Sequence, residues 1–193
     1  VLLLTTHPDT QPAATEDGAA AAGTPSVGFW RTLKPVAPLI VLLLMAQILA
    51  GLIYRGVVTY LPTHLGEAVN LGSGGMDSLI RAGFFTTLVL AFGVIGQFSG
   101  GYLGDHFRRE TLAVISALVS LLALLAMGLW QGWGLLLASM GFAVFYFMAQ
   151  PVYNSLIADY APESVRGRIY GLSFFAGFGL GSFSASLFGY VVE

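Results

Sequence analysis

Five long apolar runs, separated by short polar or glycine-rich turns, account for most of the chain. They cover about residues 36–65, 79–103, 111–130, 134–158 and 169–192. Each run is close to or above the roughly 20 residues that a helix needs to cross a bilayer. The pattern predicts an all-α polytopic bundle with five transmembrane helices.

The segment ahead of the first run differs in composition. Residues 1–4 are apolar, and we interpret them as the end of a preceding transmembrane helix. Residues 5–25 contain no large apolar side chain, which predicts a flexible linker. Residues 26–35 interleave aromatic and basic side chains, as segments at the water–lipid boundary do. We expect residues 5–35 to form a cytoplasmic loop with an interfacial end, and the chain to be part of a longer protein.

Composition supports a membrane protein and excludes several other classes. Charged residues make up 9% of the chain and hydrophobic residues 56%, with a mean hydropathy of +0.79, whereas soluble domains carry roughly 25% charged residues. A net charge of -2 gives no reason to expect a nucleic-acid partner. The chain has no cysteine, and its three histidines lie far apart in the sequence, so we expect no metal and no cofactor.

Basic residues predict the orientation of the helices. Six of the eight fall before the first run, between the second and third, and between the fourth and fifth, segments that five spans place on one side. The positive-inside rule makes this side cytoplasmic, in what we expect to be the plasma membrane. These residues are Arg31, Lys34, Arg108, Arg109, Arg166 and Arg168.

Small residues recur every four positions in two of the runs. Gly96 and Gly100 lie on one face of the second run, and Gly177 and Gly181 on one face of the fifth. Such stripes allow another helix backbone to approach closely. We expect these four glycines to act in helix packing.

Two carboxylates end apolar runs. Asp105 ends the second run and Asp159 the fourth, at the negative end of each helix dipole, where a carboxylate is disfavoured. Each therefore needs a partner, and the start of the fifth run offers Arg166 and Arg168. One hypothesis is that the carboxylates clamp the front of the fifth helix when the cytoplasmic side is closed. The alternative is that all four are solvated loop charges that set the topology.

Residues 101–109, GYLGDHFRR, resemble the loop signature of the major facilitator superfamily, G-x-L-[AG]-D-R-[FY]-G-R-[RK]. That signature joins the second and third helices of each six-helix half. His106 stands where the pattern has Arg, and the Gly between Phe107 and Arg108 is absent, as is common in the second half.

Residues 162–168, PESVRGR, resemble the superfamily loop between helices ten and eleven, and residues 5–25 resemble its central cytoplasmic loop. The resemblance implies that the five spans are helices seven to eleven of twelve. The residues of the candidate cytoplasmic gate and motif are Gly101, Gly104, Asp105, Arg108, Arg109, Asp159, Arg166 and Arg168.

The resemblance implies a secondary transporter that works by alternating access, with a solute site near mid-membrane between two halves. The other half of the same polypeptide and a small-molecule substrate would then be partners. Helices seven and ten line the cavity in this family. The candidate cavity residues on the matching runs are Gln47, Tyr54, Arg55, Tyr146, Gln150, Tyr153 and Asn154.

Arg55 admits two interpretations. A charge inside a span is costly and is usually retained for a substrate, ion or partner; alternatively, the side chain snorkels to the outer interface. Residues 54–62 resemble multidrug or fosmidomycin-type efflux members, which favours drug or metabolite efflux. No Asp or Glu lies deep inside the five runs, so the carboxylate of any proton coupling is expected in the other half.

Two other classes of protein are alternatives to a transporter. A membrane enzyme needs facing catalytic groups such as His with Asp, and the runs contain no such cluster, so we expect no enzymatic activity. A non-transporting sensor or scaffold stays open, because a fold does not determine function. We expect the chain to be inactive in transport on its own, since one half encloses no pathway.

Overall fold

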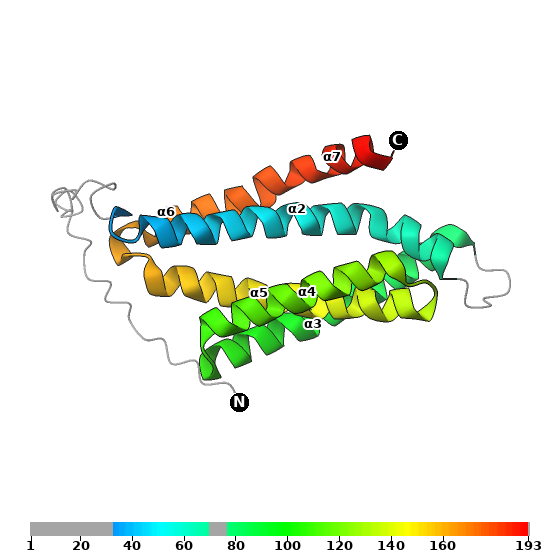
Figure 1. The fold of residues 1–193 in the computed structure, drawn as a ribbon, viewed down its shortest axis with the longest axis horizontal. Coiled ribbons are helices and arrows are strands. Elements are labelled where there is room, and N and C mark those ends of the chain that lie inside the picture. The colour runs from blue at the N-terminus through cyan, green and yellow to red at the C-terminus, as the bar shows by residue number, and fades with distance from the viewer. Residues whose placement is uncertain (1–32, 70–76, 193) are drawn as a thin grey trace, which may run out of the picture.

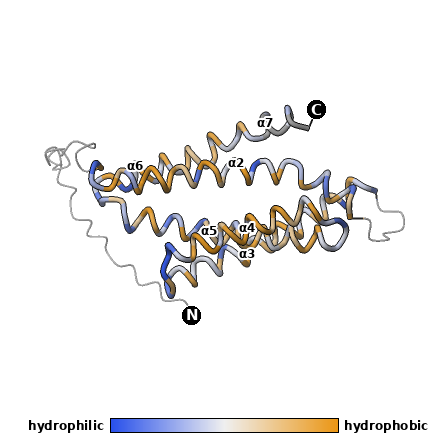
Figure 2. The backbone as a smooth tube through the Cα atoms, viewed as in Figure 1, coloured by the Kyte–Doolittle hydropathy of each residue, from blue (hydrophilic) through white to orange (hydrophobic). Residues whose placement is uncertain are grey.

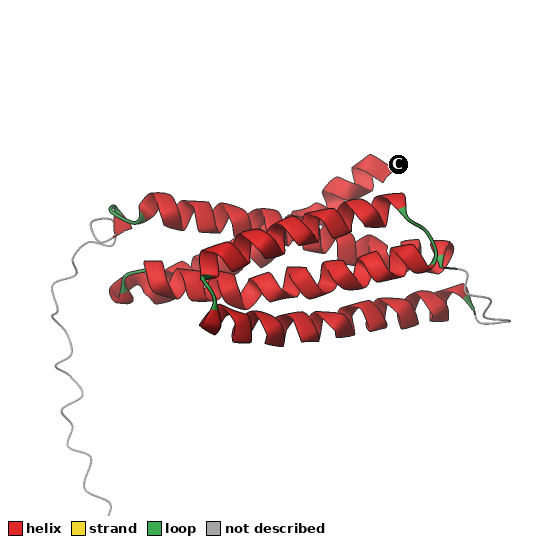
Figure 3. Cartoon of the chain, turned by 60° about the horizontal axis from the view of Figure 1, so that its bottom comes forward, coloured by secondary structure: helices red, strands yellow, loops and turns green. Residues whose placement is uncertain are grey.

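The computed structural model describes residues 33–69 and 77–192. The expectations for residues 1–4, for nearly all of the 5–35 loop, and for the middle of the loop after the first apolar run lie outside this part. Within the described ranges every regular element is helical, which confirms the all-α bundle (Figure 3).

Within residues 33–69 and 77–192, four helices are long and apolar enough to cross a membrane, while the fifth apolar run is divided into consecutive helical pieces. These pieces form one rod that runs beside α2 (Figure 1). The long helices are α2 (Ala37–Ala68), α3 (Ser78–His106), α4 (Arg109–Leu129) and α5 (Trp133–Tyr160), and the rod consists of α6 (Glu163–Phe174), the π-helical η1 (Phe175–Gly179), the 3-10 turn η2 (Leu180–Ser182) and α7 (Phe183–Val192).

The turn between α5 and α6 is shorter than the sequence suggested. Residues 159–168 were expected to be a polar loop, but the connection comprises only Ala161 and Pro162. Pro162 caps α6, its carbonyl accepting from the amide of Arg166 at 2.9 Å. Glu163 follows in the first turn, where a carboxylate complements the helix dipole. A polar helical turn carries no apolar signal, so the hydropathy pattern missed it.

Helix α5 is the centre of the bundle. Half of its most apolar 18-residue window is buried, against 28% or less in α2, α3 and α4. It contributes to both apolar clusters of the core, one around Leu156 and Ile157 and the other around Leu135 and Phe142. The polar candidates of α5, Tyr146, Gln150 and Asn154, lie along the same stretch of helix as residues of these clusters.

Two helix crossings depend on glycine. A methyl group at Gly96 or Gly100 of α3 would overlap the backbone of α5 at Val144 or Met148. On the other side of the bundle, a methyl group at Gly51 of α2 would overlap the backbone of Gly177. Gly181 also faces Gly51. The close approach of the backbones therefore occurs where the small-residue stripes lie.

Helix α4 covers α5 with one face and exposes the other. The exposed face is apolar, with Leu122 at 64% and Leu129 at 81% of full exposure. The Ser116 and Ser120 hydroxyls are buried and donate to carbonyls of their own helix, each at 2.7 Å. These two hydroxyls are thus satisfied within α4, and the exposed apolar side of the helix is suited to lipid.

Hydrophilic residues gather at the two ends of the rods, and the length between them is mostly apolar, apart from short hydrophilic stretches in α2 and α5 (Figure 2). The start of α2, the α3–α4 turn and the α5–α6 turn lie at one end, and the α4–α5 turn lies at the other (Figure 1). This arrangement gathers the basic segments that the structure describes at a single end.

Single-cysteine labelling tests this arrangement, because the chain has no cysteine of its own. His106→Cys and Ser164→Cys should react with an impermeant maleimide from the same side of sealed vesicles, since both exposed residues lie at the basic end. Gln131→Cys, at the α4–α5 turn, should react from the opposite side. Labelling of His106→Cys and Ser164→Cys from opposite sides would contradict the topology.

Candidate functional site

A small depression lies where α2, α5 and the α6–η1 rod meet. Its cavity volume is about 60 Å³. We call it the polar depression, since amides, hydroxyls and one guanidinium face it together with aromatic rings. Its lining consists of Gln47, Gly51, Tyr54, Arg55, Tyr146, Gln150, Asn154, Ser173, Phe174, Gly177 and Phe178.

The depression brings together six of the seven cavity candidates. Three lie on α2 and three on α5, at positions far apart in the sequence. Tyr153, the seventh, lines a different cavity and packs against the apolar cluster around Leu156. Their role in binding a solute remains a proposal.

Ring stacking and hydrogen bonds position the side chains of the depression. The Tyr54 and Tyr146 rings are stacked, with centroids 4.9 Å apart and planes 7° from parallel. The Tyr146 hydroxyl donates to the Ala50 carbonyl at 3.2 Å. The Gln47 Nε2 donates to the Ser173 hydroxyl at 3.1 Å, which ties α2 to α6. These contacts hold polar groups of three helices on one surface.

Arg55 lies closer to the middle of its helix than the apolar run suggested. Helix α2 has 32 residues, so Arg55 is about 4 Å past its midpoint at 1.5 Å per residue. Its guanidinium carbon lies 5.9 Å from the centroid of the Phe178 ring in η1. The side chain thus extends towards the depression and lines it.

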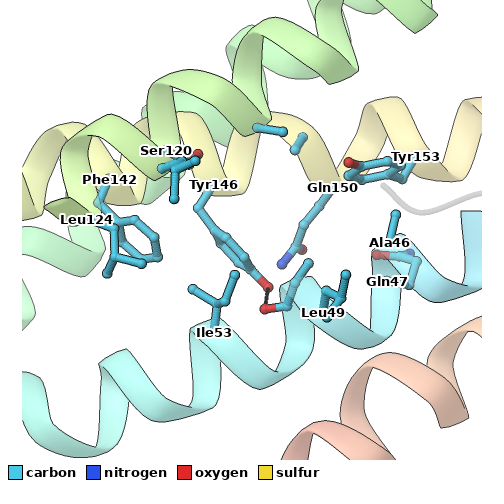
Figure 4. A pocket seen from close by; sticks show the side chains of 14 residues that line it. Ala46, Gln47, Leu49, Ile53, Ser120, Leu124, Phe142, Tyr146, Gln150 and Tyr153 are labelled. Atoms are coloured by element: carbon cyan, nitrogen blue, oxygen red, sulfur yellow. Dashed lines mark hydrogen bonds between the residues drawn. The ribbon is translucent and has the colours of Figure 1, made fainter.

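A larger cavity of about 260 Å³ lies between α2, α4 and α5 (Figure 4). We call it the apolar cavity, because most of its lining is aliphatic or aromatic, including Leu49, Ile53 and Leu124. Gln47, Tyr146 and Gln150 reach both spaces. We place the candidate solute site in the polar depression despite its smaller size, because specificity needs directional polar groups.

At the basic end, Arg109 joins α4 to α5. Its Nη1 donates to both carboxylate oxygens of Asp159, at 2.7 and 2.6 Å, and its Nε to the Gly104 carbonyl at 3.1 Å. The Asp105 carboxylate lies 3.7 Å from Nη2. Arg109 thus lies between the two carboxylates at the helix ends. Both pairs are partly exposed, so they contribute only modestly to stability.

These contacts are not the ones that the clamp hypothesis predicted, in which Asp105 and Asp159 pair with the start of the fifth helix. Asp105 and Asp159 pair with Arg109, on the neighbouring turn, and Arg166 donates to the Ala161 carbonyl at 3.4 Å. Arg168, the other basic residue of the hypothesis, is exposed. A clamp on α6 in another conformation stays a proposal.

The sequence did not single out several residues of these sites. Ser173, Phe174 and Phe178 line the depression from the α6–η1 rod. In this part of the chain the sequence had indicated only the glycines that act in helix packing. At the basic end, the Tyr160 hydroxyl donates to the Glu110 carboxylate at 2.7 Å. The four-residue spacing of Phe174 and Phe178 was an available signal; no local pattern links Tyr160 to Glu110, which lie 50 residues apart.

Metal binding finds no support in the described ranges, which contain no group of three His, Asp or Glu side chains that could hold an ion.

Comparison with known proteins adds the family. No curated protein and no solved structure matches the chain. The sequence profile described as Major Facilitator Superfamily matches residues 1–186, nearly the whole length. The structure agrees with it in being helical throughout the described ranges, with four helices suited to crossing a membrane. The chain belongs to the major facilitator superfamily, a family of integral membrane transporters.

Proposed function

We propose that the chain forms one half of a secondary active transporter that moves a small solute by alternating access. The observation that carries the proposal is the polar depression, in which three helical elements present amide, hydroxyl and guanidinium groups. Polar and ionisable groups within membrane-spanning segments usually belong to a substrate or ion pathway.

The family resemblance supports the remaining parts of the proposal. It assigns α2 and α5, the helices that supply the six candidates, to the walls of a central cavity. A second half of the same polypeptide would close that cavity from the other side and rock against this one. The plasma membrane is the proposed location, and the resemblance of residues 54–62 to efflux members favours export.

Coupling to protons would need a carboxylate from elsewhere. Among the described residues that line the polar depression, none is acidic. Asp105 and Asp159 lie at the basic end and are engaged with Arg109. A proton-binding carboxylate is therefore to be sought in the other half.

Two neighbouring substitutions test the location of the solute site. Asn154→Leu removes a polar group from the depression at similar volume, and should lower solute flux into proteoliposomes at least about tenfold if a solute hydrogen bond is lost. Tyr153→Phe removes a hydroxyl that faces the apolar cavity, and should leave the flux within about twofold of the parent. The measurement is initial flux from a panel of labelled drugs and metabolites, using the complete protein.

The reverse result, a loss with Tyr153→Phe and none with Asn154→Leu, would move the site to the apolar cavity. Absence of flux for every solute, with binding retained, would favour a sensor instead of a transporter.

A further inference from the structure

The polar depression carries charge of one sign. Among its described lining residues Arg55 alone is charged, and the others are amides, hydroxyls, glycines and aromatic rings. The Phe178 ring, 5.9 Å from the guanidinium carbon, offers a cation–π contact but does not neutralise the charge. This surface therefore presents a positive charge with no carboxylate beside it.

The chemistry of the Arg55 guanidinium limits the class of solute that it binds. A guanidinium near the middle of a membrane helix is costly unless an anion or dipoles compensate it. It presents a rigid, planar fork of N–H donors that matches a carboxylate or a phosphate, often through two parallel hydrogen bonds. A solute with one anionic group would supply the missing partner. A cationic solute would be repelled.

Aromatic rings flank the guanidinium from two elements. Tyr54 and Tyr146 stack at 4.9 Å where α2 meets α5. Phe174 and Phe178 stack at 6.1 Å, with planes 12° apart, on the α6–η1 rod. Flat apolar faces on two helical elements favour a flat apolar body between them.

We infer that the solute is a small organic anion with a planar aromatic body, and that Arg55 binds its anionic group. The inference rests on the proposed function, since it concerns the same site, and adds the class of solute. The amides of Gln47, Gln150 and Asn154 supply further polar groups around the polar depression.

Three probes that share one ring and differ in charge test the inference: benzoate, benzamide and benzylamine. Binding to the purified complete protein is measured by calorimetry at neutral pH. Benzoate should bind at least about tenfold more tightly than the other two, the margin of a charge-assisted hydrogen bond. Arg55→Gln should abolish this preference, and Arg55→Lys, which keeps the charge without the fork, should retain part of it.

Lys34→Gln is the matched control. It removes one positive charge from an exposed residue outside the depression, and should leave the preference for benzoate unchanged. The melting temperature of each variant is compared with that of the parent, so that loss of binding is not confused with loss of the fold.

Equal or tighter binding of benzamide or benzylamine overturns the inference, as does the absence of binding by all three probes. A preference for benzoate that survives Arg55→Gln removes Arg55 from the anion site. None of these results touches the transport proposal, which fails separately if the complete protein moves no solute into proteoliposomes.

Discussion

Replacing Gly100 with alanine is expected to lower the free energy of unfolding by about 2–3 kcal/mol, the upper part of the range for overpacked cores. The added methyl group would overlap the carbonyl of Met148 in α5. This neighbour is backbone, which cannot rotate away, so α3 and α5 must separate along a crossing that both helices share. The measurement is unfolding by denaturing detergent in mixed micelles.

Gly101 provides the control, one residue away on the same helix. A methyl group there meets nothing within 4 Å. Gly101→Ala should therefore leave the free energy of unfolding unchanged, or raise it by up to about 1 kcal/mol through helix propensity. Equal effects at the two positions would show that the close crossing of α3 and α5 is not what stabilises this part of the bundle.

Replacing Arg109 with glutamine is expected to slow transport by about two- to fivefold. The substitution removes the cation that holds Asp159, at the end of α5, and Asp105, near the end of α3. Each carboxylate would then face the negative end of its helix dipole without a partner. Because Asp159 is 45% exposed, water screens the pair, and an exposed ion pair shifts a conformational equilibrium only a few-fold.

The measurement is initial solute flux in proteoliposomes, with the melting temperature recorded in parallel. Exchange of the two charges, Arg109→Asp with Asp159→Arg, should restore much of the flux, because it keeps the pair and places each charge at the favourable end of its helix. Wild-type flux in Arg109→Gln, or failure of the exchange to rescue a slow variant, would contradict a role for the pair in the transport cycle.

The candidate site shows how much of a binding surface can be predicted from residue spacing along one helix. Four-and-three spacing on α5 identified Tyr146, Gln150 and Tyr153 as one group, with Asn154 adjoining. Tyr146, Gln150 and Asn154 reach the depression, whereas Tyr153 lines only the apolar cavity. Residues 153 and 154 are adjacent and point about 100° apart on a helix, so which of them faces the solute depends on how α5 is rotated in the bundle.

The ion pairs at the basic end show a second limit of prediction from the sequence. The sequence indicated that Asp105 and Asp159 each need a partner, and we assigned Arg166 and Arg168, whereas both carboxylates pair with Arg109 in the structure. The choice of Arg109 follows from the positions of the α3–α4 turn and the end of α5, which lie close enough for a bond of 2.6 Å. The number of residues between Arg109 and Asp159 does not predict how close their side chains lie in space.

By itself the sequence determined the helical class, the apolar runs, and the gathering of basic turns on one side. These properties depend on local quantities, because a bilayer requires every span to satisfy its own backbone and to be apolar over a given length. Only the tertiary structure decided which groups meet, as Gln47 does with Ser173 across 126 residues. Such contacts depend on how whole helices are rotated and cross one another. Close packing at Gly51 and Gly100 sets these crossings, and the hydropathy of the sequence carries no information about them.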